Sequence, residues 1–187
     1  KESRQGKFVK EVKCLRGADI FLCMSSSVSN VPTRFIGVGK KMLVAGDLVV
    51  EISGGSPAQS TGRIAYVNDG LLKRLAMPCI CSNFSFAFNM KQRQNAPFFY
   101  YLWRTLYQNN AMFGYESKTT GIKNLLWDSF INSYKVRKPS EYNLENFNQV
   151  AEINLSKIQS ILAEIDELIA LRDWLLPMLM NGQVEVK

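Results

Sequence analysis

Apolar residues in the first half of the chain recur at every second position over short stretches, and this spacing predicts β-strands. In CSNFSFAFNM, Phe84, Phe86 and Phe88 alternate with small or polar residues, as in a strand with one buried face. The run KKMLVAGDLVVEISGG predicts a strand, a glycine-aspartate turn at 46–47 and a second strand from Leu48 to Ile52. The run TGRIAYVNDG predicts another short strand that ends in a turn.

Helical patterns begin near the middle of the chain. The segment APFFYYLWRTLYQNN lacks the alternation and contains no glycine, and Pro97 stands where the first turn of a helix tolerates proline. We therefore predict a helix there. The segment LLWDSFINSYKV predicts a short helix followed by a strand that Pro139 ends.

The C-terminal part has a different pattern. From Tyr142 to Trp174 no glycine or proline interrupts the chain, and apolar residues recur seven positions apart, as in a coiled coil. Two of the three resulting columns form a coiled-coil seam, and the third widens it. The columns are Ile161, Leu168 and Leu175; Ile158, Ile165 and Arg172; and Leu155, Leu162 and Ile169.

The length of this helix limits where it can lie. About thirty helical residues span about 45 Å, more than the diameter of a domain of this size. We therefore expect the helix to project from the body, and the alternative is an amphipathic helix folded back on that body. Pro177 is expected to end the helix. The residues around it form an apolar cluster closed by a glycine: Leu175, Leu176, Met178, Leu179, Met180 and Gly182.

Charge divides the chain at the same place. Residues 1–140 carry 20 Lys and Arg against 8 Asp and Glu, whereas residues 141–173 carry 2 against 7. Excess Lys and Arg attract phosphate groups and release their counterions, so the two parts favour different partners. A solvated basic surface is the alternative. We predict an α+β fold with two parts, a mixed α/β domain over 1–140 and a long coiled-coil helix with an apolar tail over 141–187.

Several classes of enzyme site are missing from the sequence. The chain has no histidine, which excludes Ser-His-Asp and Cys-His arrangements. No phosphate-binding P-loop, glycine-rich cofactor motif or adenine-methyltransferase tetrad is present. Asp47 and Glu51 have the spacing of possible nuclease carboxylates, but no third acid or lysine stands at an interpretable distance. We therefore expect no catalysis, no metal site and no cofactor on this chain.

Cysteine usage and hydropathy suggest a cytoplasmic protein. The four cysteines show no CxxC spacing, and we expect buried, reduced thiols. No run of about eighteen apolar residues exists, and the first residues lack the apolar core of a signal peptide. The four are Cys14, Cys23, Cys79 and Cys81.

Two polar loops have the composition of anion-binding sites. In YESKTTGIKNL, Gly121 allows a tight turn, hydroxyls and backbone amides can donate to phosphate oxygens, and two lysines supply charge. In ISGGSPAQSTGR, a glycine pair permits close approach, the Gln59 amide can pair bidentately with adenine, and Arg63 can contact phosphate or guanine. A solvated hairpin loop is the alternative for the second segment.

The order of these motifs resembles the specificity subunit of type I restriction-modification enzymes. The motifs are LVAGDLVVEISGG, TGRIAYV, APFFYYLW, TTGIKNL and a long helix closed by LRDWLLPMLMNGQV, and together they extend over nearly the whole chain. The closing motif is the most specific of them. The resemblance implies a target recognition domain that reads one half of a split site in double-stranded DNA, and a conserved helix that spaces it from a second such domain.

The resemblance also implies partners. Such a subunit has no catalysis of its own and positions methyltransferase subunits and a restriction subunit, so S-adenosylmethionine, ATP and Mg²⁺ are expected only on those partners. The anion bound by the two loops would be DNA. The residues expected at that interface are Gly54, Gly55, Gln59, Thr61, Arg63, Lys118, Thr119, Thr120, Lys123 and Asn124.

The chain departs from the full-length pattern because it has one recognition domain and one spacer helix. It is expected to be the C-terminal half of a longer subunit or a half-length form, and the missing initial methionine favours the first. The helix would pair with the equivalent helix of the same subunit or with a second copy of the chain. The alternative function is a coiled-coil assembly protein whose basic head binds nucleic acid without sequence preference. The expected pairing residues are Leu155, Ile158, Ile161, Leu162, Ile165, Leu168 and Ile169.

Overall fold

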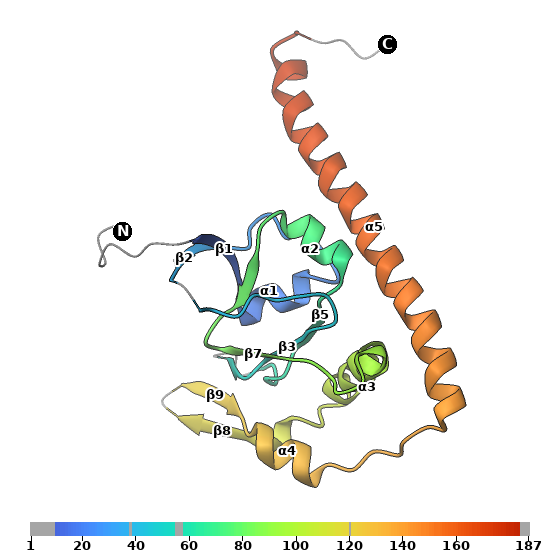
Figure 1. The fold of residues 1–187 in the computed structure, drawn as a ribbon. Coiled ribbons are helices and arrows are strands. Elements are labelled where there is room, and N and C mark those ends of the chain that lie inside the picture. Colours follow the sequence, from blue (N-terminus) through green and yellow to red (C-terminus); the bar gives the residue numbers. More distant parts are fainter. Residues whose placement is uncertain (1–9, 38, 55–57, 120, 184–187) are drawn as a thin grey trace.

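The computed structural model describes residues 10–37, 39–54, 58–119 and 121–183, and the side chains of Lys118 and Thr119 fall outside that description. The described part is a mixed α+β body with small sheets and one long C-terminal helix (Figure 1). The helices are α1 (Gly17–Leu22), α2 (Asp69–Leu75), α3 (Ala96–Gln108), α4 (Trp127–Ser133) and α5 (Glu141–Met180), with short 3₁₀ turns η1 (Arg93–Asn95) and η2 (Phe113–Tyr115).

The described strands form three three-stranded sheets. In the first, β1 pairs antiparallel with β2 and parallel with β6. In the second, β3 lies between β5 and β7, and in the third, β9 lies between β4 and β8. The strands are β1 (Lys10–Leu15), β2 (Thr33–Ile36), β3 (Leu48–Glu51), β4 (Ser53–Gly54), β5 (Ile64–Tyr66), β6 (Cys79–Cys81), β7 (Ser85–Phe88), β8 (Glu116–Thr119) and β9 (Ile122–Leu125).

Strand β3 separates two apolar clusters because its alternate side chains point to opposite faces. Val49 packs with residues of α1 and α2, whereas Leu48 and Val50 pack with α3. All three are fully buried. This confirms the predicted strand from Leu48, although β3 ends at Glu51.

The turn before β3 is confirmed, but the strand predicted ahead of it is not. Gly46 has a φ of 91°, which favours glycine, and the Asp47 carboxylate accepts a hydrogen bond from the Val44 amide at 3.0 Å. Residues 39–45, all of which are described, form no strand. They make single backbone bonds instead, such as Leu43 N to Cys79 O at 2.8 Å.

The segment after β5 begins a helix where the sequence predicted only a turn. The Asn68 side chain accepts a hydrogen bond from the Leu71 amide and so caps α2. The helix buries Leu71 and Leu75 against the first cluster. Turns and helix N-caps favour the same residue types, so the sequence at 68–70 fits either structure. Burial of these two leucines favours the helix here.

Strand β7 exists, but its phenylalanine face is only partly covered. Phe88 is half-buried against Phe99 and Trp127, while Phe84 and Phe86 are exposed. The opposite face carries small residues, and Ala87 lies directly across from the buried Val49. The predicted alternation was therefore right for the strand and wrong about which face is better buried.

The helices α3 and α4 are confirmed, but the strand predicted after α4 is absent from the described residues 134–139. Trp103 and Tyr100 of α3 are buried in the second cluster. Cys14, Cys23 and Cys79 are buried free thiols, as predicted, and Cys81 is half-buried. Burial raises the pKa of Cys23 and of Cys79 to about 12.

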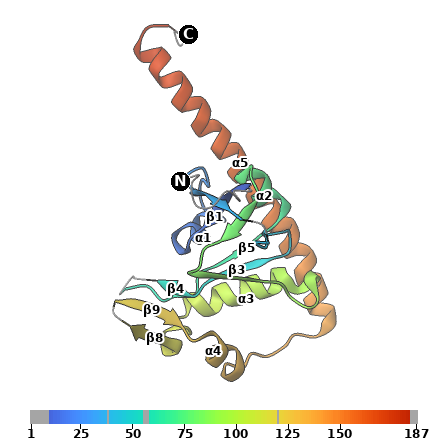
Figure 2. The same cartoon turned by 60° about the vertical axis from the view of Figure 1, so that its left-hand side comes forward.

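Helix α5 has 40 residues and is both packed and projecting. Its buried residues all lie between 144 and 162, and none of residues 163–180, every one of them described, is buried. Figures 1 and 2 show the second half extending beyond the body. The helix also continues through Pro177, contrary to expectation. A proline this close to the end disturbs only the last turns, so the rest of the helix keeps its hydrogen bonds.

The predicted boundary at residue 140 marks the start of α5 and not a break in packing. Leu155 of α5 belongs to the same apolar cluster as Tyr100 and Trp103. No helix among the described residues is both long and apolar enough to cross a membrane.

Candidate nucleic-acid interface

The small sheet β4-β9-β8 brings the two predicted anion-binding loops together. Ser53 lies opposite Asn124, and Gly54 lies opposite Lys123. The end of β4 therefore lies beside the β8-β9 hairpin, at the lower left of Figure 2. Sequence alone did not indicate that the two loops are neighbours.

Gly121 lies at the turn of the β8-β9 hairpin. Gly121 has a φ of 83°, which confirms the predicted tight turn. Lys118 pairs with Lys123 in the ladder, so the hairpin carries both predicted lysines at one level. Gly55 and Thr120 lie outside the described residues, as do the side chains of Lys118 and Thr119.

A buried carboxylate, Glu116, links the two loops. Its Oε1 accepts hydrogen bonds from the Thr61 amide at 2.6 Å, the Thr61 hydroxyl at 3.0 Å and the Ser60 hydroxyl at 3.0 Å. Its Oε2 lies 3.2 Å from Lys123 Nζ. Lys123 also donates to the Gln59 carbonyl. The network therefore holds the segment 59–61 against the hairpin.

The electrostatics of Glu116 match this geometry. Burial opposes its ionisation, but the hydrogen bonds from Thr61, Lys123 and Ser60 outweigh that effect and hold the pKa of the carboxyl below its ordinary value. Glu116 is therefore charged at neutral pH and neutralises Lys123.

This network corrects two predicted contacts. Lys123 is only 5 % exposed and Thr61 is 2 % exposed. The polar groups of both already have partners inside the protein, so contact with DNA would require the network to open. We therefore assign Lys123 and Thr61 to the loop scaffold and not to the interface itself.

Arg63 is also committed to an internal partner. Its Nε and Nη2 donate to the two carboxylate oxygens of Glu51 at 2.8 and 2.6 Å, a bidentate pair. Glu51 is buried beside Gly17 and Gly54, and a Cβ on Gly17 would lie 2.4 Å from its Oε1. Glu51 thus acts as a counter-ion, and Asp47 acts as a turn cap. Neither has the setting of the nuclease carboxylates considered above.

The remaining side chains lie nearer the surface. Gln59 is exposed, with its carbonyl anchored by Lys123. Asn124 accepts a hydrogen bond from the Ser53 hydroxyl at 2.6 Å, which ties β9 to β4. Of the two side chains predicted to contact bases, Gln59 is exposed, whereas Arg63 is paired with Glu51.

Helix α3 supports the loops from behind. The Trp103 indole N–H donates to the Gly62 carbonyl at 2.6 Å, and the Tyr107 hydroxyl donates to the Ser60 carbonyl at 3.0 Å. Sequence reasoning identified neither of these anchors nor Glu116. The available signal for Glu116 was a lone acid within a basic, hydroxyl-rich segment.

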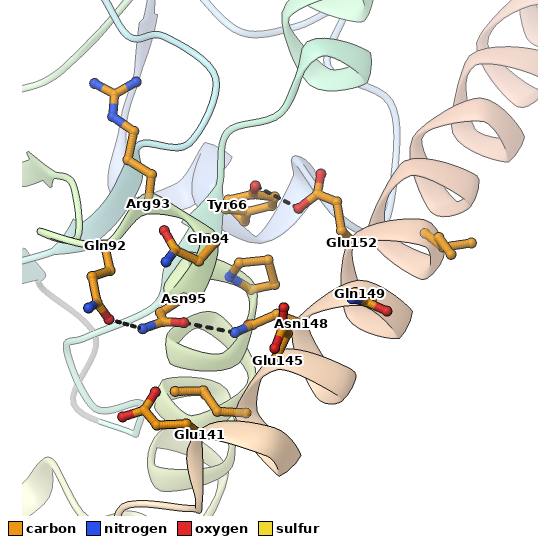
Figure 3. A pocket seen from close by; sticks show the side chains of 13 residues that line it. Tyr66, Gln92, Arg93, Gln94, Asn95, Glu141, Glu145, Asn148, Gln149 and Glu152 are labelled. Carbon is orange, nitrogen blue, oxygen red and sulfur yellow. Dashed lines mark hydrogen bonds between the residues drawn. The ribbon is translucent and has the colours of Figure 1, made fainter.

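A large cavity lies on the other side of the body, between α5 and the start of α3 (Figure 3). Its volume is about 780 Å³, and its walls carry Glu141, Glu145 and Glu152. The Tyr66 hydroxyl donates to Glu152 at 2.8 Å; burial, and then this bond, raise the pKa of Tyr66. These three carboxylates repel phosphate, and Arg93 is a lining residue of opposite charge. Among the described residues, no cluster of three or more potential ligands is placed to hold a metal.

The predicted pairing residues of α5 fall on two different faces. Leu155 and Leu162 are buried against the body. Ile161 is 47 % exposed and Leu168 is 63 % exposed, on the face formed by the first two columns. The third column therefore holds α5 on its own body at these two positions, which corrects its assignment to a partner. The members still exposed to a substantial degree are Ile161, Ile165, Leu168 and Ile169, and Ile158 is half-buried.

Comparison with known proteins adds no relative: no protein-family model, curated protein or solved structure matched the chain.

Proposed function

We propose that this chain is a DNA-reading specificity subunit of a type I restriction-modification complex, or the C-terminal half of one. In this role it reads one half of a bipartite site in double-stranded DNA and positions adenine methyltransferase and restriction subunits. Those partners carry S-adenosylmethionine, ATP and Mg²⁺. The chain contributes recognition and placement.

The observation that carries the proposal is the convergence of the two loops. The two loops were predicted separately from the sequence. The β4-β9 ladder places Gly54 opposite Lys123, so the two loops lie at one edge of the sheet. Figure 2 shows this edge on the side of the body away from α5. Loops held by a rigid scaffold are where recognition residues concentrate. Here the Glu116 network and the α3 anchors supply that scaffold.

Charge supports the same division of roles. The basic excess lies in residues 1–140, and the acidic residues of 141–173 lie on α5. A basic surface favours phosphate, and an acidic helix with an exposed apolar face favours a protein partner. The exposed apolar residues Ile161, Ile165, Leu168 and Ile169 form a seam on α5, and we assign this seam to a second helix. That helix belongs either to the same full-length subunit or to another copy of the chain.

Methylation-site sequencing tests the proposal directly. Cells that express this chain together with its methyltransferase should methylate adenine within one split motif, and cells lacking the chain should not. Gln59→Ala should change or weaken one half of that motif while leaving the other half intact.

A competition assay separates this function from the alternative one. A coiled-coil protein with a merely basic head would lose labelled DNA to any competitor of equal charge, and it would direct no methylation motif. Methyl transfer by the isolated chain with S-adenosylmethionine alone would contradict the non-catalytic role.

A further inference from the structure

Helix α5 leaves the body at a buried polar joint centred on Arg74 of α2. The Arg74 side chain is only 2 % exposed. Its Nε donates to Asp166 Oδ2 at 3.0 Å and its Nη1 to Gln159 Oε1 at 2.8 Å. The same guanidinium donates to the Cys23 carbonyl at 3.3 Å and to the Ser26 carbonyl at 2.6 Å. One side chain thus connects α2, the end of α1 and two turns of α5.

Gln159 completes the joint from the α5 side. It is 1 % exposed, and its Nε2 donates to the Cys23 carbonyl at 2.8 Å and lies 3.0 Å from Met24 Sδ. A Cβ on Gly70 would lie 2.6 Å from the Cβ of Gln159. The absence of a side chain at Gly70 therefore lets α2 and α5 approach closely, as Figure 1 shows for the middle of α5.

The chemistry of these contacts differs from that of the rest of the α5 interface. Leu155 and Leu162 bury apolar area, which stabilises contact but is non-directional. A guanidinium presents its N–H groups in a rigid planar fork, so its bonds have defined directions. Arg74 therefore constrains the rotation and tilt of α5 in a way that the leucines do not.

The joint also lies where support ends. Among the described residues of α5, Asp166 is the last one that forms a hydrogen bond with the body. No residue from 163 to 180 is buried. The direction of the projecting half therefore depends on the contacts made at 159–166.

We propose that Arg74 is a positioning residue that fixes the direction in which α5 leaves the body. By fixing this direction, Arg74 also fixes where the loops at the β4-β9 edge lie relative to any helix paired with the exposed seam of α5. The consequence for the separation of two DNA half-sites rests on the proposed function. The joint itself can be measured without DNA, so the two ideas can fail separately.

The expected displacement follows from helix length. Asp173 lies fourteen residues after Gln159, which is about 21 Å along the axis. A change in tilt of about 10° at the joint would move Asp173 by about 4 Å. A displacement of this size is within reach of spin-label distance measurements.

The experiment uses the whole chain with nitroxide labels at Thr33→Cys on β2 and Asp173→Cys on α5. Both sites are exposed, and Cys81→Ser removes the half-buried native thiol. Labelled chain is diluted into excess unlabelled chain, so that measured distances arise within one molecule. Arg74→Met retains length and removes the donors, while Lys73→Met makes the same charge change at an exposed neighbour.

We expect a narrow distance distribution for the parent chain and for Lys73→Met. Arg74→Met should at least double the width of the distribution or move its centre by about 4 Å, at unchanged helix content by circular dichroism. Gly70→Ala keeps Arg74 and pushes on Gln159, so it should shift the centre without the same broadening. If Arg74→Met does not fold, Arg74→Lys takes its place, because it keeps the charge and removes the planar fork of donors, and it should broaden or shift the distribution in the same way. A distribution unchanged in the variants that fold, or broad in the parent chain, overturns the proposal.

Discussion

Replacing Glu116 with glutamine tests the buried network that holds the two loops together. The side chains of Lys123 and Glu116 are only 6 % and 4 % exposed, and Nζ lies 3.2 Å from Oε2. Removing one partner of a buried ion pair costs about 3–5 kcal/mol, because the other charge is left uncompensated. An amide oxygen at position 116 can still accept from Thr61 and Ser60. We therefore expect Glu116→Gln to lower the free energy of unfolding by about 3 kcal/mol, the low end of that range.

Replacing the other member of the ion pair, Lys123, should lower the free energy of unfolding by less. In Lys123→Met the carboxylate of Glu116 still receives hydrogen bonds from the Thr61 amide, the Thr61 hydroxyl and the Ser60 hydroxyl. The loss is then close to that of one charge-assisted hydrogen bond, about 1.5–3 kcal/mol. The double variant should lose less than the sum of the two single losses, since each single change removes the same ion pair.

The assay is urea unfolding at pH 7, followed by far-ultraviolet circular dichroism and tryptophan fluorescence. Trp103 is one of three tryptophans that contribute to this signal, and its indole N–H donates to the Gly62 carbonyl beside the network. Lys73→Met is a matched control at an exposed lysine and should change stability by less than about 0.5 kcal/mol. The reasoning fails if Glu116→Gln is as stable as the parent chain, or if Lys123→Met is the more damaging of the two.

Three further predictions follow from the same structure. The folded-state pKa of Glu116 is lowered, so its contribution to stability is present above about pH 4.3 and is lost as pH falls through the folded-state pKa. In acid titrations followed by circular dichroism, the parent chain should therefore lose stability more steeply than Glu116→Gln below about pH 4.3. In fluorescence anisotropy, Gln59→Ala should weaken binding to the correct DNA target by about 1–3 kcal/mol with little effect on binding to random DNA. Lys118→Ala should weaken binding to every DNA and flatten the salt dependence of that binding. Equal losses on both DNAs for Gln59→Ala would show that Gln59 does not read a base. Ile161→Asp combined with Ile165→Asp should convert a homodimer into a monomer in sedimentation. Leu155→Ala should lower the free energy of unfolding by about 2–5 kcal/mol without changing the sedimenting mass. A parent chain that is monomeric at micromolar concentration would contradict pairing through Ile161 and Ile165.

Local pattern was enough to predict several elements. The predicted helix in APFFYYLWRTLYQNN is α3, and the strand predicted from Leu48 is β3. The signals were the length of the α3 segment with proline in its first turn, and the apolar run that follows the turn at 46–47. The prediction failed where one pattern serves two structures, as at Asn68, which caps α2 and does not close a turn. It also failed at Pro177, because proline is tolerated near the end of a helix that is already formed.

The sequence by itself determined the composition of the candidate site and the division of charge, but not which side chains are available to a ligand. Lys118 and Lys123 look equivalent in SKTTGIKNL. Lys123 is neutralised by Glu116 and anchored to Gln59, which is 64 positions away. Arg63 is likewise paired with Glu51 across the ladder. Partners this distant along the chain meet only when the sheets assemble, so no local spacing reveals them.

The same limit applies to α5. Its heptad columns follow from the sequence, because side chains seven residues apart lie on one helical face whatever surrounds the helix. Which column meets the body depends on the shape of that body, and in particular on Gly70, Arg74 and the second apolar cluster. Tertiary packing therefore assigned Leu155 and Leu162 to the body and left Ile161 and Leu168 exposed. An amphipathic pattern specifies that a face will be buried, and only the folded chain specifies what buries it.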